Sequence, residues 1–380
     1  MKIQQFKSVN GTDWEIISSN SDSANPNLVI IFGSTELLKN NVNVNYLKEK
    51  FPNAIFAGCS TSGEIAGVQV YDDTIIATAV EFEKTQIISH SIDITSPDDS
   101  YSKGAELIKM FDSKNLKHVF VLSDGLNING SKLVEGMRSV APAEVSITGG
   151  LAGDGSRFSE TYIIDDQKNS VSKKVTAVGF YGNDIKIGYG SLGGWDSFGI
   201  DRVVTKSKGN VLYELDNTPA LTLYKSFLGD QAKNLPSSGL LFPLSMRTDS
   251  DTTPVVRTIL AIDENAQSLT FAGDIPEGAY VRLMKANFDR LIDGAEEAAK
   301  VSVTGSDGSV PELAILISCV GRKLVLKQMV EEEVEAVQTV IGEKPIITGF
   351  YSYGEIAPFM KEAKCELHNQ TMTITTFSEN

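Results

Sequence analysis

One pattern occurs three times along this chain, and it limits the fold more than any other feature. In each copy an apolar segment ends at a serine, a helical segment follows, and a second apolar segment ends at a glycine. The copies cover residues 29–58, 119–149 and 314–349. The serine and the glycine are 24, 26 and 31 residues apart (58−34, 149−123, 349−318), which is the length of a strand–helix–strand crossover. The pattern therefore predicts an α/β fold with pairs of parallel strands.

Two of the closing glycines begin nearly the same loop. Residues 58–67 and 349–358 are identical at five of ten positions and share the run Gly-Glu-Ile-Ala. The second copy closes with a glycine-rich variant over residues 149–155. Open α/β sheets bind ligands beyond the carboxyl ends of their strands, and glycine lets the backbone approach a ligand closely. The loops therefore predict a binding site where the strands end.

The length of the chain favours more than one domain. A chain of 380 residues exceeds the usual size of a single hydrophobic core. The segment 234–239, Asn-Leu-Pro-Ser-Ser-Gly, has the composition of a linker. We therefore expect two domains, 1–232 and 233–380. The predicted fold class is α/β, with two related lobes that contain mixed β-sheets and β-α-β crossover units.

Charge and apolar content argue against some classes of partner. Acidic residues outnumber basic ones by 49 to 34, which gives a net charge of −15. The phosphates of nucleic acid or of an anionic membrane surface would be repelled by this charge. The longest apolar runs are strand-sized, no targeting segment is visible, and three cysteines cannot all pair in disulfides. These features predict a cytoplasmic protein that binds neither nucleic acid nor membrane.

The repeated loops supply the first candidate ligand-binding residues. Glu64 and Glu355 belong to the matching loops and are placed to accept hydrogen bonds from an ammonium or hydroxyl group of a ligand. The competing interpretation is that both carboxylates cap backbone amides or pair with an arginine. Further residues of these loops are expected to line the pocket: Cys59, Ser60, Thr61, Gly150, Asp154 and Tyr353.

Two arginines and a cysteine are also candidates. Arg157 and Arg322 would hold an anionic group, because a guanidinium binds a carboxylate through two parallel hydrogen bonds. The competing role for Arg157 is a surface ion pair. Cys319 lies where a strand ends and a helix begins, a position that lowers a thiol pKa and suits a nucleophile. Cysteines at strand ends are also common as inert core residues, and a cysteine hydrolase needs a histidine base. The segment 149–155 lacks the order of a dinucleotide or phosphate loop.

The histidines have structural interpretations. His90 alternates with isoleucines and is predicted to lie on a sheet face, and His118 begins a strand. Cys365 and His368 have the spacing of metal ligands, but one such pair cannot fill a zinc shell, so no metal is expected. His368 is the candidate axial ligand if the chain binds haem. Three serines at strand ends are predicted to cap the helices that follow them: Ser34, Ser123 and Ser318.

Taken together, these segments resemble FIST-domain proteins, with both the N-terminal and the C-terminal modules of that family. The segments that carry the resemblance, in chain order, are 58–65, 149–155, 209–216, 219–221, 318–322, 353–358 and 368–371. The resemblance implies a sensory, ligand-binding module of signal transduction, for which small ligands such as amino acids have been proposed. Some family members resemble haem-containing nitric-oxide sensors. No histidine-kinase core, nucleotide-cyclase domain or membrane anchor is readable in this chain.

The sequence therefore predicts a cytoplasmic sensory protein rather than an enzyme. It would bind a small polar, amino-acid-like metabolite in a pocket formed by the strand-end loops, and no cofactor is expected. One alternative is a haem-based nitric-oxide sensor, and another is a cysteine-dependent enzyme of unknown reaction. A standalone receptor would act on a separate signalling protein, such as a histidine kinase or a cyclic-nucleotide enzyme.

Overall fold

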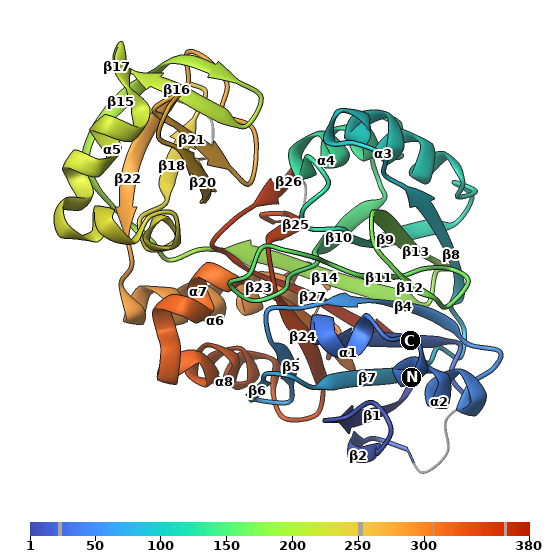
Figure 1. Cartoon of the computed structure of the whole chain (residues 1–380). Helices are drawn as coiled ribbons and strands as arrows, with labels where there is room; N and C mark the ends of the chain where they lie inside the picture. The colour runs from blue at the N-terminus through green and yellow to red at the C-terminus, as the bar shows by residue number, and fades with distance from the viewer. Residues whose placement is uncertain (22–24, 250–253, 307, 361–362) are drawn as a thin grey trace.

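The chain is organised around a core that three sheets share. The computed structural model describes residues 1–21, 25–249, 254–306, 308–360 and 363–380. Within them, three mixed sheets enclose one apolar core, and a fourth, antiparallel sheet stands to one side (upper left in Figure 1). The mixed α/β fold predicted from the repeats is confirmed.

Each mixed sheet is built on one of the predicted parallel pairs. The pairs are β3 (Leu28–Gly33) with β4 (Ile55–Ser60), β9 (Leu116–Ser123) with β10 (Ser146–Leu151), and β23 (Leu313–Cys319) with β24 (Ile346–Ser352). The first sheet has the order β12 (Ser170–Val171), β11 (Ile163–Ile164), β4, β3, β7 (Ile75–Glu81), β1 (Lys2–Ser8), β2 (Glu15–Ser19). The second has the order β26 (Cys365–His368), β25 (Gly354–Pro358), β10, β9, β13 (Lys174–Tyr181), β8 (Gln86–Asp93). The third has the order β6 (Gln69–Tyr71), β5 (Glu64–Ala66), β24, β23, β27 (Met372–Glu379), β14 (Ile185–Leu192).

The three sheets exchange strands in a closed cycle. The hairpin β5–β6 follows the first parallel pair in the chain but joins the third sheet. In the same way β11–β12 follows the second pair and joins the first sheet, and β25–β26 follows the third pair and joins the second sheet. An isoleucine of each donated strand pairs with a closing glycine of the repeat: Ile65 with Gly349, Ile164 with Gly58, and Ile356 with Gly149.

The paired strands are apolar throughout because both of their faces are buried. In β3, Leu28, Ile30 and Phe32 face the shared core, whereas Val29 and Ile31 face outward. Helices cover the outward faces: α1 (Thr35–Leu38) and α2 (Val42–Lys50) on the first sheet, α3 (Ser100–Lys109) and α4 (Gly130–Val140) on the second, α6 (Phe288–Gly305) and α8 (Val330–Ile341) on the third. Helix α7 (Val320–Leu326) and the 3-10 turns η1 (Pro97–Asp99) and η4 (Lys327–Met329) complete this part.

The fourth sheet is inserted between β14 and α6 and has its own apolar core. Its order is β19 (Val255–Arg257), β18 (Leu244–Arg247), β22 (Tyr280–Lys285), β15 (Asp196–Lys208), β16 (Val211–Leu215), β21 (Ser268–Phe271), β20 (Ile259–Asp263), with β17 (Thr218–Pro219) beside β16. Helix α5 (Ala220–Leu228) and the 3-10 turns η2 (Gly229–Asn234) and η3 (Ser237–Leu241) pack beside it. We call residues 196–285 the inserted layer. The expected domain boundary at 232/233 falls within η2 and stays a prediction.

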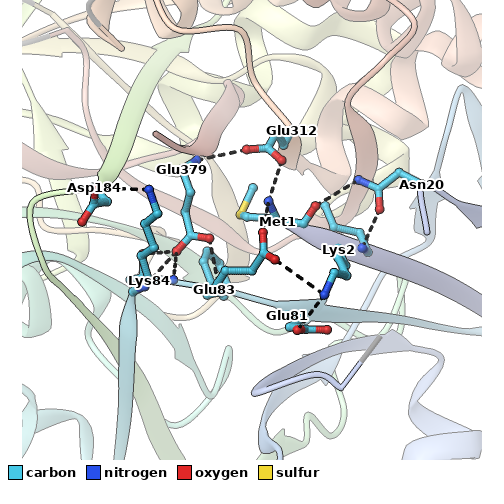
Figure 2. Close-up of polar contacts among 12 residues, drawn as sticks. Met1, Lys2, Asn20, Glu81, Glu83, Lys84, Asp184, Glu312 and Glu379 are labelled. Atoms are coloured by element: carbon cyan, nitrogen blue, oxygen red, sulfur yellow. Dashed lines mark hydrogen bonds and ion pairs between the residues drawn. The ribbon is translucent and has the colours of Figure 1, made fainter. Parts of the chain in front are cut away.

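The two ends of the described chain lie next to each other, beside strands β1 and β27 (Figure 1). Figure 2 shows that one carboxylate serves both: the Met1 ammonium donates to Glu312 Oε2 at 2.7 Å, and Glu379 N–H donates to Glu312 Oε1 at 3.1 Å. The Glu379 carboxylate in turn accepts hydrogen bonds from the backbone N–H groups of residues 83–85. These contacts join the end of β27 in the third sheet to the start of β1 in the first sheet.

Candidate functional site

The loops that follow the three parallel pairs meet at one end of the shared core. Between the first two loops, the Gly153 N–H donates to the Ser60 carbonyl, and the Ser60 hydroxyl donates to the Gly153 carbonyl, both at 2.9 Å. Between the last two, the Tyr353 N–H donates to the Leu151 carbonyl at 3.2 Å. We call these loops the hub: residues 60–63, 151–155 and 351–354. The hub brings together four of the predicted site residues: Ser60, Thr61, Asp154 and Tyr353.

Glu64 and Glu355 lie beside the hub at equivalent places in their sheets. Both side chains are buried, Glu64 at 1% exposure and Glu355 at 0%. Each carboxylate accepts hydrogen bonds from a hydroxyl three residues earlier and from the N–H and hydroxyl of a threonine: Glu64 from Thr61 and Thr74, Glu355 from Ser352 and Thr371. Burial raises the pKa of Glu64 to about 7 and that of Glu355 to about 8, although the hydrogen bonds oppose this rise. Their contacts are those of the structural role considered above.

Asp154 shapes the loop that leaves the hub. Its buried carboxylate accepts hydrogen bonds from three successive N–H groups at 2.8 to 3.0 Å: those of Phe158, Ser159 and Glu160. The Tyr353 hydroxyl donates to the same carboxylate and to the Gly155 carbonyl. The ring of Phe158 stacks on Tyr353 with 4.5 Å between centroids. Arg157 remains half exposed, with its Nε 3.9 Å from Asp154 Oδ2.

A cleft of about 410 Å³ opens beside this loop. Ser156 and Phe158 line it from the hub side, Leu324 lines it from helix α7, and the inserted layer closes it on the opposite side. The inserted layer contributes residues of η2, η3 and β20: Gln231, Asn234, Pro236, Ser237, Ser238, Leu240, Leu241, Ile259 and Leu260. The lining is mainly apolar, with neutral hydroxyl and amide groups among it, which is the usual composition of a small-molecule site.

Gln370, between β26 and β27, connects to the inserted-layer wall of the cleft. Its Nε2 donates to the Leu240 carbonyl at 3.0 Å, and its backbone carbonyl accepts from Trp195 Nε1 at 3.0 Å. Among the described residues, Gln370 Oε1 is buried without a hydrogen-bond partner. The segment predicted to be a linker, 234–239, therefore forms part of a cleft wall.

None of the eleven predicted site residues is among those that line this cleft. Gly150 sits in β10, paired with Glu355, and Cys59 belongs to the shared core. Arg322 is fully buried against Glu333, with Nε and Nη2 at 3.0 and 2.8 Å from Oε2. Cys319 is 2% exposed, and burial raises its thiol pKa well above the ordinary value. Burial likewise raises the thiol pKa of Cys59, which opposes thiolate chemistry at either residue.

His368 is enclosed as well. Its Nε2 lies 2.8 Å from the Ala357 carbonyl, its ring packs on Phe359 at 4.1 Å between centroids, and burial lowers its pKa to about 4. A haem could reach this ring only if those contacts broke. In the part of the chain that the structure describes, no cluster of three metal-ligating side chains was found. Within the same residues, none of the helices is both long and apolar enough to cross a membrane.

The capping role predicted for the strand-end serines is wrong. Ser34 stands at the N-cap of α1 but makes no capping hydrogen bond. The Ser123 hydroxyl donates to the adjacent Asp124 carbonyl, and the Ser318 hydroxyl donates to Glu333. Helix α4 is capped instead by Asn129, whose side chain accepts from the Lys132 N–H. Ser123 and Ser318 lie in buried strands, so nearby buried groups become their partners, whereas the buried Ser34 hydroxyl has no hydrogen-bond partner among the described residues.

Comparisons with known proteins agree with the order of the motifs. The FIST N domain model matches residues 27–218, and the FIST C domain model matches residues 220–358. The chain is similar to uncharacterized protein MJ1623 from Methanocaldococcus jannaschii, with 25% identity over 319 residues. That match covers 75% of this chain and 58% of the relative's own length. A cyanuric acid hydrolase from A. caulinodans aligns over 92% of this chain and 90% of its own, with 6% identity and a TM-score of 0.33, which is too low for any conclusion.

Proposed function

The chain belongs to the FIST family, and we propose that it is a cytoplasmic sensory protein that binds a small metabolite in the cleft between the hub and the inserted layer. FIST domains are associated with signal transduction and with small-ligand sensing. The two successive domains account for the two related lobes expected from the sequence. The single observation that carries the proposal is the 410 Å³ cleft at the ends of the strands.

The lining of the cleft suggests the class of ligand. Phe158 and Leu324 offer apolar contact, and Ser156 and Asn234 offer hydroxyl and amide groups. Arg157 lies between Ser156 and Phe158 in the sequence, is half exposed and does not itself line the cleft; we propose that its side chain turns toward a ligand carboxylate at the mouth. An amino-acid-like metabolite with an apolar side chain combines these features.

The walls of the cleft suggest how binding becomes a signal. Ser156 belongs to the loop that leaves the hub, whereas Asn234 and Ser237 belong to the inserted layer. A ligand that touches both walls favours the arrangement in which they are close, and it shifts the equilibrium only by its preference for that arrangement. A separate signalling protein, such as a histidine kinase or a cyclic-nucleotide enzyme, would read the difference.

Filling the cleft tests the proposal. We expect some of the twenty amino acids or their close relatives to raise the melting temperature saturably. The variant Ser156→Trp should lose this response, because an indole at the lining occupies the ligand's space. Ser159→Trp is the matched control: it changes an exposed serine of the same loop that does not line the cleft. A response that survives in Ser156→Trp would place the ligand elsewhere, and a panel without any response would contradict the receptor role.

A further inference from the structure

A second cavity, of about 270 Å³, lies between helix α4, the hairpin β18–β19 and strand β26. Helix α4 lines it with Ser131, Glu135 and Arg138, which are four and three residues apart and so share one helix face. The hairpin contributes Arg247 and Arg257. The cavity therefore joins the second sheet to the inserted layer, at a place separate from the cleft beside the hub.

Arg257 is the unusual residue of this cavity. It is 6% exposed, yet its hydrogen bonds go to three backbone carbonyls, those of Asp274, Val256 and Leu367, at 3.1 to 3.3 Å. In the described ranges no carboxylate lies within 4.0 Å of its guanidinium, and its Nη2 makes no hydrogen bond. Buried arginines are rare unless paired with an acid. Burial lowers the Arg257 pKa to about 10 because the charged form is poorly solvated.

The charges around the cavity leave an excess of positive charge. Glu135 pairs with Lys132 at 2.7 Å, and Arg247 pairs with Asp201 at 2.8 Å. Of the remaining charged lining residues, Arg138 and Arg257 stand against Glu366 alone, and none of these three forms an ion pair within the part of the chain that the structure describes. Among the lining residues two guanidiniums thus stand against one carboxylate; Asp274, which does not line the cavity, is the other acid whose charge acts on Arg257.

We propose that this cavity is an anion-binding site, distinct from the hub cleft, for the carboxylate or phosphate group of a small metabolite. The Arg257 Nη2, whose hydrogens are not used by the backbone carbonyls, and the planar donors of Arg138 hold such a group through charge-assisted hydrogen bonds. The bound group would supply the negative partner that Arg257 lacks. The Arg257 Nη1 already donates from the inserted layer to the Leu367 carbonyl of β26. The anion would therefore strengthen the contact between the inserted layer and the second sheet.

Calorimetric titration of the whole chain with inorganic phosphate, and separately with succinate, tests this site at constant ionic strength set with sodium chloride. We expect saturable binding of at least one of them, weakened about tenfold or more in Arg138→Gln, since a charge-assisted contact to a half-buried arginine is lost. Arg257→Gln should weaken it further. Arg138 lies on the outer face of a helix, so its variant tests the site even if Arg257→Gln does not fold.

Two control variants and the two probes make the result specific. Arg290→Gln removes an exposed arginine of α6 and should leave the titration unchanged. Ser156→Trp should also leave it unchanged, which separates this site from the hub cleft. Binding of phosphate alone would identify a phosphate site, and binding of succinate alone a carboxylate site. The absence of saturable binding for both probes, or equal affinity in Arg138→Gln and the unaltered chain, would overturn the proposal.

Discussion

Glu355 illustrates how a residue's role depends on its environment. Its loop suggested a ligand contact, but its carboxylate lies fully buried and accepts hydrogen bonds from Ser352 and Thr371. Burial places its pKa at about 8, above the ordinary value of 4.5. The folded state therefore holds this proton over a pH range in which the unfolded chain has released it. The stability that the protonated carboxyl contributes is complete below pH 4.5 and is lost as the pH rises toward 8.

We predict that the free energy of unfolding falls between pH 6.5 and pH 8. Glu64, whose pKa is about 7, adds to this fall, whereas the buried histidines His118 and His368 oppose it at the lower end of the window, because they are neutral in the folded state and still take up protons near pH 6.5 in the unfolded chain. One carboxyl that titrates only in the folded state changes the free energy by about 1.4 kcal/mol per pH unit. Glu355→Gln should flatten the slope measured by urea denaturation, whereas Glu335→Gln, which removes an exposed carboxylate of α8, should not. An unchanged slope in Glu355→Gln would show that Glu355 is ionised throughout.

Arg322 shows why some residue roles could not be predicted. Its position after a strand suggested an anion clamp, yet its partner is Glu333, eleven residues later in the acidic run 331–335. Glu333 is the member of that run that turns inward, where Ser318 and Tyr351 also donate to it. Sequence spacing could not distinguish Glu333 from its exposed neighbours, because the packing of α8 on α7 decides which side faces in.

At the scale of elements, the parallel pairs could be predicted because each is a local feature. The strand, the helix and the second strand of each crossover follow one another in the chain, so their apolar patterns can be recognised in one continuous segment. The exchange of β5, β11 and β25 between sheets could not be predicted, since the sequence of an apolar strand does not identify the strand with which it pairs. The cleft wall was missed for a related reason: Asn234 and Ser237 have the composition of any surface loop.

The closing glycines of the repeat have a steric reason. A Cβ on Gly149 would lie 1.8 Å from the Val121 carbonyl oxygen, and one on Gly349 would lie 2.0 Å from that of Leu316. In each case the carbonyl belongs to the residue paired with the glycine in the parallel ladder. Both strands are central and buried on both faces, so neither can shift aside. The glycine thus permits the close contact of each parallel pair just before the hub.

We predict that Gly349→Ala lowers the free energy of unfolding by about 3 kcal/mol, because the methyl group would meet backbone rather than a movable side chain. Gly305→Ala is the matched control at the end of α6, where the nearest atom to an added Cβ is 3.7 Å away. It should be neutral or slightly stabilising, since alanine is the better helix former. Chemical denaturation of both variants gives the comparison. Equal stability of the two would mean that β23 and β24 can separate locally.

At the scale of the whole molecule, the closed cycle of strands makes the position of the chain ends unimportant for the core. Strand β7 leads directly to β8 in the next sheet, and β13 leads directly to β14. The corresponding step, from β27 to β1, is broken only by the two ends, which meet at Glu312. A peptide connection from β27 to β1 would be equivalent to the direct connections β7–β8 and β13–β14.

We therefore predict that a circular permutant with residue 380 joined to residue 1 by a short glycine–serine linker, and opened between Ser113 and Lys114, folds to the same structure. The new opening lies in an exposed turn between α3 and β9, where breaks are tolerated. Loss of the Met1 ammonium, which pairs with the partly exposed Glu312, should lower stability by about 1 kcal/mol. The control permutant opens the hub between Thr61 and Ser62 and should not fold, because the donated strand β5 would lose its connection to β4. Circular dichroism and urea denaturation compare the two; folding of both would show that the hub loops are dispensable for the exchange of strands.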